Sequence, residues 1–310
     1  MAIFYPLNDG IYCVDALYVS EQVASIYLIR EGDEVAVIET GTYHSVANLL
    51  GTLEALEIDP CQIRYVIPTH VHLDHAGGAG EMMRRFEQAE LLIHPRGAAH
   101  MIDPEKLIAG TVAVYGQEKF DALYGRIEPV DESRVRIMQD STRIGLQNRE
   151  LEFFDTQGHA RHHFCIYDDR SRGVFTGDSF GISYRPMKTL QRGLIPTTPP
   201  TQFDPAAMHA TVEKIMGFDP ELLYLTHYGE FAGPSAQVDS FNRWIDTYVD
   251  LTRRVNPLDE ASTVELERSL THTLLDGLSD AEVPLSRVLQ TDLRLNAQGL
   301  AWWWQRTQGD

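Results

Sequence analysis

Residues 69–78 read Thr-His-Val-His-Leu-Asp-His-Ala-Gly-Gly and place four potential metal ligands within six residues. A short apolar run typical of a buried strand comes directly before them. Side chains two residues apart in an extended segment point to the same side, so His70 and His72 can reach one point in space. Asp74 and His75 belong to the turn that follows and can reach a second point. The spacing therefore predicts a metal site at the end of a strand.

The residue types narrow the choice of metal. Imidazole and carboxylate together suit zinc, iron or manganese, whereas cages of oxygen ligands suit calcium or magnesium. Gly77 and Gly78 let the backbone pass close to the site before a helix begins. We expect zinc, with iron or manganese as the alternatives.

Three further candidate ligands each follow a predicted strand closely. They are His159, Asp178 and His227, and the strands are 151–154, 174–176 and 222–225. Active sites of α/β folds collect at the C-terminal ends of strands, where loops leave a rigid scaffold. We therefore expect these side chains to join the first four.

The ordered motifs HVHLDHAGG, TQGH, TGD and LTHYG resemble the metallo-β-lactamase fold superfamily over about residues 10–230, and most of all its glyoxalase II and lactonase-like hydrolases. The resemblance implies an α/β fold, a four-layer αββα sandwich with the site along one edge of the sheets. It also implies two divalent metal ions. The first would be bound by His70, His72 and His159. The second would be bound by Asp74, His75 and His227, and Asp178 would bridge the two.

Paired cations can share a hydroxide and make it nucleophilic near neutral pH. One ion also polarises the carbonyl or phosphoryl oxygen of the substrate. We expect Asp74 to be catalytic as well, accepting a hydrogen bond from the bridging water and shuttling its proton. Metal-bound hydroxide would then hydrolyse an ester, thioester, lactone or phosphodiester bond in a small-molecule substrate. Glu39 is our candidate for the acceptor that fixes a ligating histidine.

A second histidine competes with His159. His163 stands four residues further on, where members of the superfamily often carry another histidine, and His162 precedes it. We favour His159 as the ligand and expect the later histidine to pack beside the site.

A rival motif occurs at residues 177–181, Gly-Asp-Ser-Phe-Gly, which match the nucleophile elbow of α/β-hydrolases. Ser179 would form a triad with His227 and either Asp204 or Asp219. The elbow needs a helix directly after the serine, and the following residues lack a helical period. The triad would also leave five candidate ligands without a role, so we favour the metal site.

The rest of the chain predicts two regions, a catalytic domain at 1–235 and a helical extension at 236–310. Residues 104–124 read as helices inserted between strands, and Asp204 with Pro205 reads as a helix start. Three consecutive tryptophans at 302–304 cannot all face one core. At least one should cover another surface, either the substrate cleft, a partner subunit or the outside of the sandwich, which leaves a homodimer open.

The loop 179–203 carries side chains that could bind an anionic part of the substrate or lie in solvent. They are Tyr184, Arg185, Lys188 and Arg192. The helical extension together with the insertion would restrict access to small or narrow substrates.

Composition excludes several classes of partner. The 26 basic and 45 acidic residues give a net charge of −19, which disfavours binding to nucleic acid or to anionic membranes. Three widely spaced cysteines and the lack of a visible signal peptide or apolar span predict a cytoplasmic protein. Two functions of other classes stay open: a metal-containing ligand-binding or regulatory protein with little turnover, and a mono-iron oxygen-using enzyme of the same fold.

Overall fold

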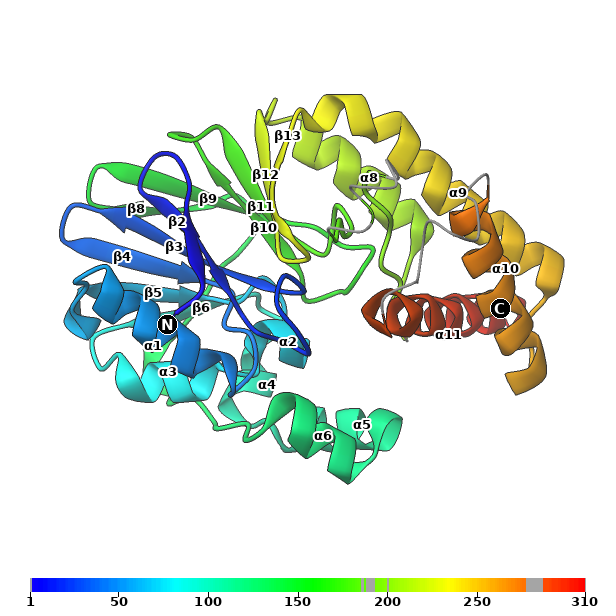
Figure 1. The fold of residues 1–310 in the computed structure, drawn as a ribbon, viewed down its shortest axis with the longest axis horizontal. Helices are drawn as coiled ribbons and strands as arrows, with labels where there is room; N and C mark the ends of the chain where they lie inside the picture. Colours follow the sequence, from blue (N-terminus) through cyan, green and yellow to red (C-terminus); the bar gives the residue numbers. More distant parts are fainter. Residues whose placement is uncertain (1, 185–186, 188–192, 200, 277–286, 310) are drawn as a thin grey trace. The chain divides into compact units, whose positions relative to one another are not determined.

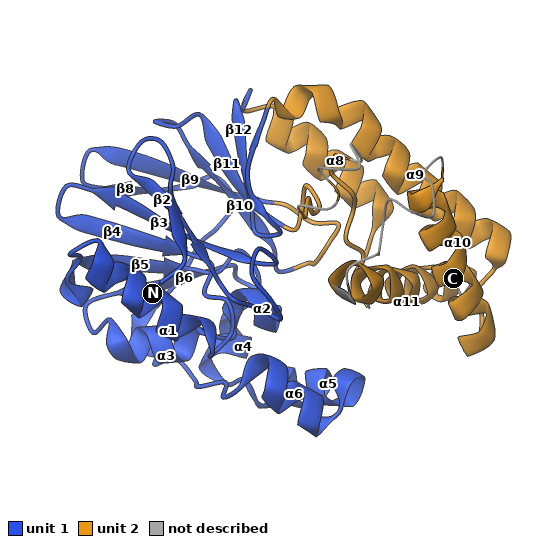
Figure 2. Ribbon diagram, viewed as in Figure 1, with its two compact units in different colours: residues 1–155, 162–177, 219–232 blue, residues 156–161, 178–218, 233–310 orange. Residues whose placement is uncertain are grey.

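The computed structural model describes residues 2–184, 187, 193–199, 201–276 and 287–309 (Figure 1). The chain divides into two compact units, coloured in Figure 2. Unit 1 comprises residues 1–155, 162–177 and 219–232, and unit 2 comprises residues 156–161, 178–218 and 233–310. The domain boundary after residue 235 stays a prediction.

Unit 1 contains a first sheet whose described strands run in the order β1 to β7. The first four strands pair antiparallel, and β4, β5, β6 and β7 pair parallel. The strands are β1 (Phe4–Pro6), β2 (Ile11–Asp15), β3 (Ser25–Glu31), β4 (Glu34–Ile38), β5 (Ile63–Ile67), β6 (Glu90–Ile93) and β7 (Val135–Ile137). Parallel neighbours need crossover connections, which α1 (Ser45–Ala55) and α3 (Ala79–Arg85) supply along one face of the sheet in Figure 1.

The second sheet of unit 1 has the order β13-β12-β11-β10-β9-β8 and is antiparallel except for the β11–β12 pair. Its strands are β8 (Thr142–Leu146), β9 (Arg149–Asp155), β10 (Phe164–Asp168), β11 (Gly173–Gly177), β12 (Leu222–Leu225) and β13 (Gly229–Ala232). Tyrosines join the sheets face to face, because Tyr27 of β3 donates to the Leu225 carbonyl at 2.6 Å and Tyr65 of β5 donates to that of Gly145 at 3.2 Å.

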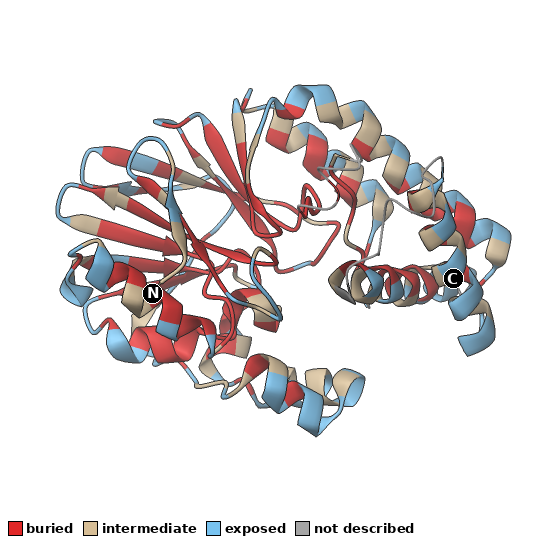
Figure 3. Ribbon diagram, in the orientation of Figure 1, coloured by how far each residue is buried: buried red, intermediate tan, exposed pale blue. Residues whose placement is uncertain are grey.

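The most buried residues lie in the strands of the two sheets, which are largely red in Figure 3. All five residues of β11 are buried, as are all but one of β3. On the other face of the first sheet, apolar side chains pack β2 to β6 against α1 and α3. Two mixed sheets flanked by helices, with further helices toward the C-terminus, confirm the predicted fold class.

The remaining helices fall largely where the sequence predicts them. Unit 1 adds α2 (Leu73–Ala76), α4 (Ala98–Ile102), α5 (Glu105–Tyr115), α6 (Gln117–Tyr124) and the 3₁₀ turns at Pro60–Gln62 and Glu132–Arg134. Unit 2 contains α8 (Pro205–Met216), a 3₁₀ turn at Pro234–Gln237, α9 (Val238–Val255), α10 (Glu260–Leu275) and α11 (Arg287–Gly309). The helical insertion is therefore confirmed, and so is the helix start, since Asp204 accepts a hydrogen bond from the Ala207 N–H with Pro205 in the first turn.

Some expectations fall elsewhere. The sequence predicts no strand at residues 4–6, 142–146 or 229–232, where β1, β8 and β13 lie, because each is only partly buried and its apolar pattern is weak. Arg185, Lys188 and Arg192 lie outside the described residues, as does part of the predicted C-terminal helical region at 277–286. Within the part of the chain that the structure describes, no helix is long and apolar enough to cross a membrane.

Candidate metal centre

The centre in unit 1 begins where neighbouring strands end. Ile38 and Ile67 are register partners at the ends of the parallel strands β4 and β5, so the chain leaves both strands at one edge. Glu39 follows the first strand and Thr69 with His70 follows the second. From the second sheet, β12 ends at Leu225 and delivers His227 to the same group of side chains.

His70 and His72 converge as the alternation of an extended segment predicts. The Nε2 of His70 lies 2.8 Å from the Nδ1 of His72. The Thr69 hydroxyl donates to Glu39 at 2.6 Å, so its oxygen accepts from the Nδ1–H of His70 at 3.1 Å. A neutral imidazole has one N–H only, and the Nε2 of His70 therefore presents a lone pair toward its neighbour.

Asp74, His75 and His227 form the second group. The Nδ1–H of His75 donates to Glu39 at 2.9 Å, and that of His227 donates to the Val23 carbonyl at 2.7 Å. In the neutral form of each ring the lone pair is then on Nε2, and the two Nε2 atoms lie only 3.3 Å apart. The Oδ2 of Asp74 is 3.7 Å from the first Nε2 and 3.4 Å from the second.

Two lone pairs and a carboxylate oxygen that face one another repel unless a cation lies among them. The three ligand atoms lie within 4.8 Å of one another, and nitrogen with carboxylate oxygen is the donor set that zinc and similar ions accept. The residues present therefore fit a divalent metal ion. One detail corrects the sequence analysis: Asp74 and His75 belong to the one-turn helix α2 rather than to a turn.

Glu39 orients the ligands through several hydrogen bonds. Its carboxylate accepts from the Thr69 backbone N–H at 3.0 Å, from the hydroxyls of Thr69 and Thr226 at 2.6 and 2.9 Å, and from His75. These donors fix the ring and tautomer of a buried ligand, which raises its basicity toward a metal. The predicted role of Glu39 is thus matched by its contacts.

The two remaining predicted ligands belong to unit 2. The Nε2 of His159 lies 3.3 Å from the Oδ2 of Asp178, and both side chains are buried. The other ring nitrogen of His159, Nδ1, donates to the Thr197 carbonyl at 3.2 Å, so Nε2 is the ring nitrogen directed toward Asp178. Five of the predicted ligands therefore lie in unit 1 and two in unit 2. That all seven form one centre stays a prediction.

Two histidines pack behind the ligands of unit 1. The His163 ring stacks on His70 with centroids 4.8 Å apart, and the His162 ring lies 5.6 Å from that of His72. Burial, followed by the nearby His72, lowers the pKa of His162 to about 3, so this ring is neutral. Both rings lie against ligands rather than away from them, as expected for a packing role.

The nucleophile elbow finds no support. No helix follows Ser179 among the described residues 180–184, and Ile182 pairs with Ile195 in an isolated bridge instead. Asp204 serves as the cap of α8, and Asp219 pairs with Arg172 at the surface. His227 is oriented by the Val23 carbonyl rather than by either carboxylate.

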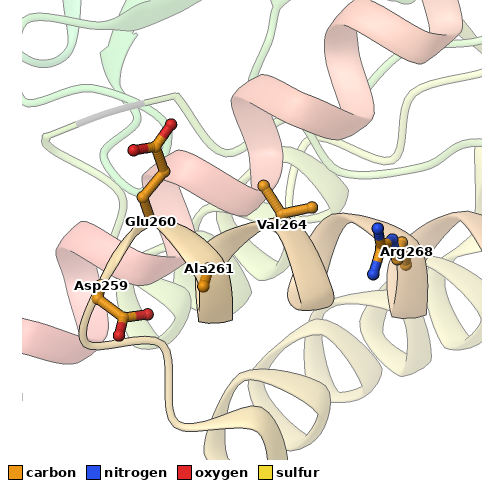
Figure 4. A pocket seen from close by; sticks show the side chains of 5 residues that line it. All are labelled: Asp259, Glu260, Ala261, Val264 and Arg268. Carbon is orange, nitrogen blue, oxygen red and sulfur yellow. The ribbon is translucent and has the colours of Figure 1, made fainter.

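A surface depression in unit 2 is unrelated to this chemistry. It follows the first turns of α10, where side chains of mixed polarity line it (Figure 4). They are Asp259, Glu260, Ala261, Val264 and Arg268, and none of them is a predicted ligand.

The sequence analysis missed two tyrosines beside the centre. The hydroxyls of Tyr18 and Tyr124 lie 3.4 Å apart. Burial, followed by the neighbouring Tyr18 and Tyr115, raises the pKa of Tyr124, and the charge of Asp74 adds to the shift. The two residues come from separate segments with no shared motif, so no spacing signal could have found them.

A family model described as the metallo-beta-lactamase superfamily matches residues 19–227. The match covers β3 to β12 and all seven predicted ligands. The chain belongs to the metallo-β-lactamase superfamily. The predicted enzyme class, a metallo-hydrolase of this superfamily, is confirmed at that level.

Two curated proteins with similar sequences allow a further comparison. The metallo-beta-lactamase fold-containing protein ST1585 of Sulfurisphaera tokodaii is 24% identical over 212 residues, which cover 67% of this chain and 74% of that protein. The human acyl-coenzyme A thioesterase MBLAC2 is 29% identical over 192 residues, which cover 56% of this chain and 64% of that protein. The match therefore spans less than two thirds of the thioesterase.

Solved structures share the fold. The structure of ST1585 has a TM-score of 0.65 at 21% identity, covering 95% of this chain and 99% of that one. The protein TTHA1429 from Thermus thermophilus has a TM-score of 0.69 at 16% identity, covering 97% and 94%.

Proposed function

We propose that this chain is a dinuclear metal-dependent hydrolase of acyl thioesters, with its two divalent ions held by the seven predicted ligands. The observation that carries the proposal is the convergence of the ring nitrogens of His75 and His227 on the carboxylate of Asp74. The bond class is supported by the bovine, chicken and human relatives, each named an acyl-coenzyme A thioesterase. Zinc is the ion we expect for these ligands.

Bound divalent ions would activate water and polarise the thioester carbonyl. The chain's own residues supply orientation and proton transfer. Glu39 fixes His75, and the Val23 carbonyl fixes His227. The side chain of Asp74 is 22% exposed, whereas that of His75 is fully buried. Asp74 is therefore the group that can receive a proton at the centre and pass it to solvent.

The net negative charge of the chain favours a small-molecule substrate over nucleic acid. The net charge of −19 would repel nucleic acid. We therefore propose an acyl thioester of a small molecule, and we rank a phosphodiester last among the candidate bonds.

The test is hydrolysis by the purified protein, with its metal content measured, across four probes: a thioester, a lactone, an aryl ester and an aryl phosphodiester. Native protein is compared with a chelated sample, with that sample after reloading, and with His227→Asn and Asp178→Asn. His272→Asn is the matched control, because His272 is exposed on α10. We expect thioester cleavage by loaded native protein and by the control. We also expect two ions per chain and a rate loss in the ligand variants of about 10³-fold, equivalent to several kcal/mol.

Other outcomes decide between the alternatives. Preferential cleavage of another probe would replace the thioester with that bond class. Two bound ions without cleavage of any probe would favour the ligand-binding or regulatory function. A single bound iron with oxygen consumption would favour the oxygen-using enzyme.

A further inference from the structure

The helical insertion of unit 1 presents apolar side chains that the protein covers only in part. Three buried residues, Leu73, Phe120 and Tyr124, form a small cluster apart from the main core. Partly buried side chains pack against it, and we call them the α5–α6 face. They are Leu107, Ile108, Val112, Tyr115, Leu123 and Ile127.

The α5 part of this face has helical spacing. Leu107, Ile108, Val112 and Tyr115 recur on one side of the helix, as in a helix that packs on a core. No residue of α5 is buried, however. An apolar stripe that stays half-exposed gives up part of the free energy that burial would contribute. Such a face is better explained by a ligand that covers it than by packing alone.

The face is continuous with the metal centre. Leu73, which belongs to the buried cluster, is the residue before Asp74 on α2. Tyr124, also in the cluster, has its hydroxyl 3.4 Å from that of Tyr18. Tyr18 comes from the loop that also supplies the Val23 carbonyl to His227. An apolar group on the face would therefore end next to α2, which carries the predicted ligands Asp74 and His75.

We propose that the α5–α6 face binds the acyl chain of the thioester, with Tyr18 and Tyr124 at the end nearest the metal ligands. This inference rests on the proposed function and names its substrate class. From Leu107 to Tyr115 the helix rises about 12 Å at 1.5 Å per residue. An extended hydrocarbon of roughly ten carbons has that length, given C–C bonds of about 1.5 Å. The face thus suits a medium-length acyl chain.

The first test is hydrolysis of a thioester series with acyl chains of two to sixteen carbons by the metal-loaded protein. We expect KM to fall by about two- to fourfold per added methylene and to level off near ten carbons. Val112→Ser and Ile108→Ser should raise KM for the decanoyl thioester by roughly three- to tenfold, because each removes apolar surface from the face. Their kcat, and their hydrolysis of the acetyl thioester, should match the native protein.

Val114→Ser is the matched control, since Val114 lies on the same helix but outside the cluster and is 57% exposed. It should leave all constants unchanged. A KM independent of chain length would overturn the inference, and so would equal losses on the acetyl and decanoyl thioesters. Dissociation of an oligomer by Val112→Ser, seen by sedimentation, would show that a second copy covers the face instead.

A binding measurement keeps the inference separate from the proposed function. The probe is an S-decyl thioether that cannot be hydrolysed, titrated calorimetrically into the metal-loaded native, Val112→Ser and Val114→Ser proteins. Weaker binding by Val112→Ser alone supports an acyl-chain site even if no thioester is cleaved. Equal affinities, or no binding, would overturn it even if thioesters are cleaved.

Discussion

At the scale of single residues, Glu39 combines backbone strain with function. Its φ of 65° lies in the left-handed region that side chains rarely adopt, at a cost of order 1–3 kcal/mol. From this position its carboxylate meets Thr69, His75 and Thr226 together. The hydrogen bonds that orient two metal ligands offset the strain.

Glu39→Gln should weaken metal binding by about 10- to 100-fold. A glutamine amide replaces one acceptor oxygen with a donor, so at least one N–H or hydroxyl that now faces the carboxylate loses its partner. Competition with a chromogenic chelator measures the affinity. Glu54→Gln, an exposed change on α1, is the control. Equal affinities in the two variants would mean that Glu39 does not orient the site.

Gly177→Ala should disturb the packing behind His70. A Cβ at this position would come within 2.4 Å of the His163 ring and 2.5 Å of the Thr69 hydroxyl, at a backbone φ of 49°. We expect a loss of about 1–3 kcal/mol in the free energy of unfolding and weaker metal binding. Urea unfolding of the metal-free protein measures the first effect. Gly145→Ala meets nothing within 4 Å and should change stability far less.

At the scale of elements, α2 shows how tertiary contacts create a helix. Its four residues are too few for a stable helix on their own. The backbone N–H and the hydroxyl of Thr40 both donate to the His75 carbonyl at 2.8 Å, and the Gly78 N–H donates to the Thr40 hydroxyl at 3.1 Å. The segment that follows β4 (Glu34–Ile38) therefore holds α2 in place, and with it the ligands that α2 carries.

The N-terminus of α8 gives a prediction that also tests the nucleophile elbow. Asp204→Ala removes the side chain that accepts from the Ala207 N–H, which should lower the free energy of unfolding by about 1 kcal/mol. Thioester hydrolysis should be unchanged. Urea unfolding and steady-state kinetics measure the two effects. A fall in kcat of three orders of magnitude in this variant or in Asp219→Ala would instead revive the Ser179 triad.

At the scale of the whole molecule, metal binding should stabilise the fold. Removing the ions leaves the lone pairs of His75 and His227 facing one another, and any ligand bound only by the folded state stabilises it by mass action. Free metal at 1,000 times Kd contributes about 4 kcal/mol per site. Calorimetry should therefore show Tm falling by several degrees on chelation and recovering on reloading. A Tm of the native protein that does not change on chelation would contradict this. His75→Asn removes a ligand of the second ion only, so chelation should lower its Tm less than that of native protein.

The sequence by itself determined the residue types at the metal centre and the order of the elements that deliver them. His70, His72, Asp74 and His75 follow a strand, so the alternation of side chains in an extended segment already directs the first two to one point. The inserted helices and the cap of α8 could be predicted from the sequence as well. These features depend on neighbours in the chain, and local spacing encodes them.

Only the tertiary structure decided how the ligands are held and what lies beside them. Glu39 accepts a hydrogen bond from Thr226, 187 residues further along the sequence. The Val23 carbonyl accepts one from His227, 204 residues further along. The α5–α6 face meets α2 through Leu73, and Tyr18 meets Tyr124 across 106 residues. Such contacts depend on which strands become neighbours and in what register. Periodicity along one chain segment carries no information about that pairing, because the free energy of long-range packing selects it.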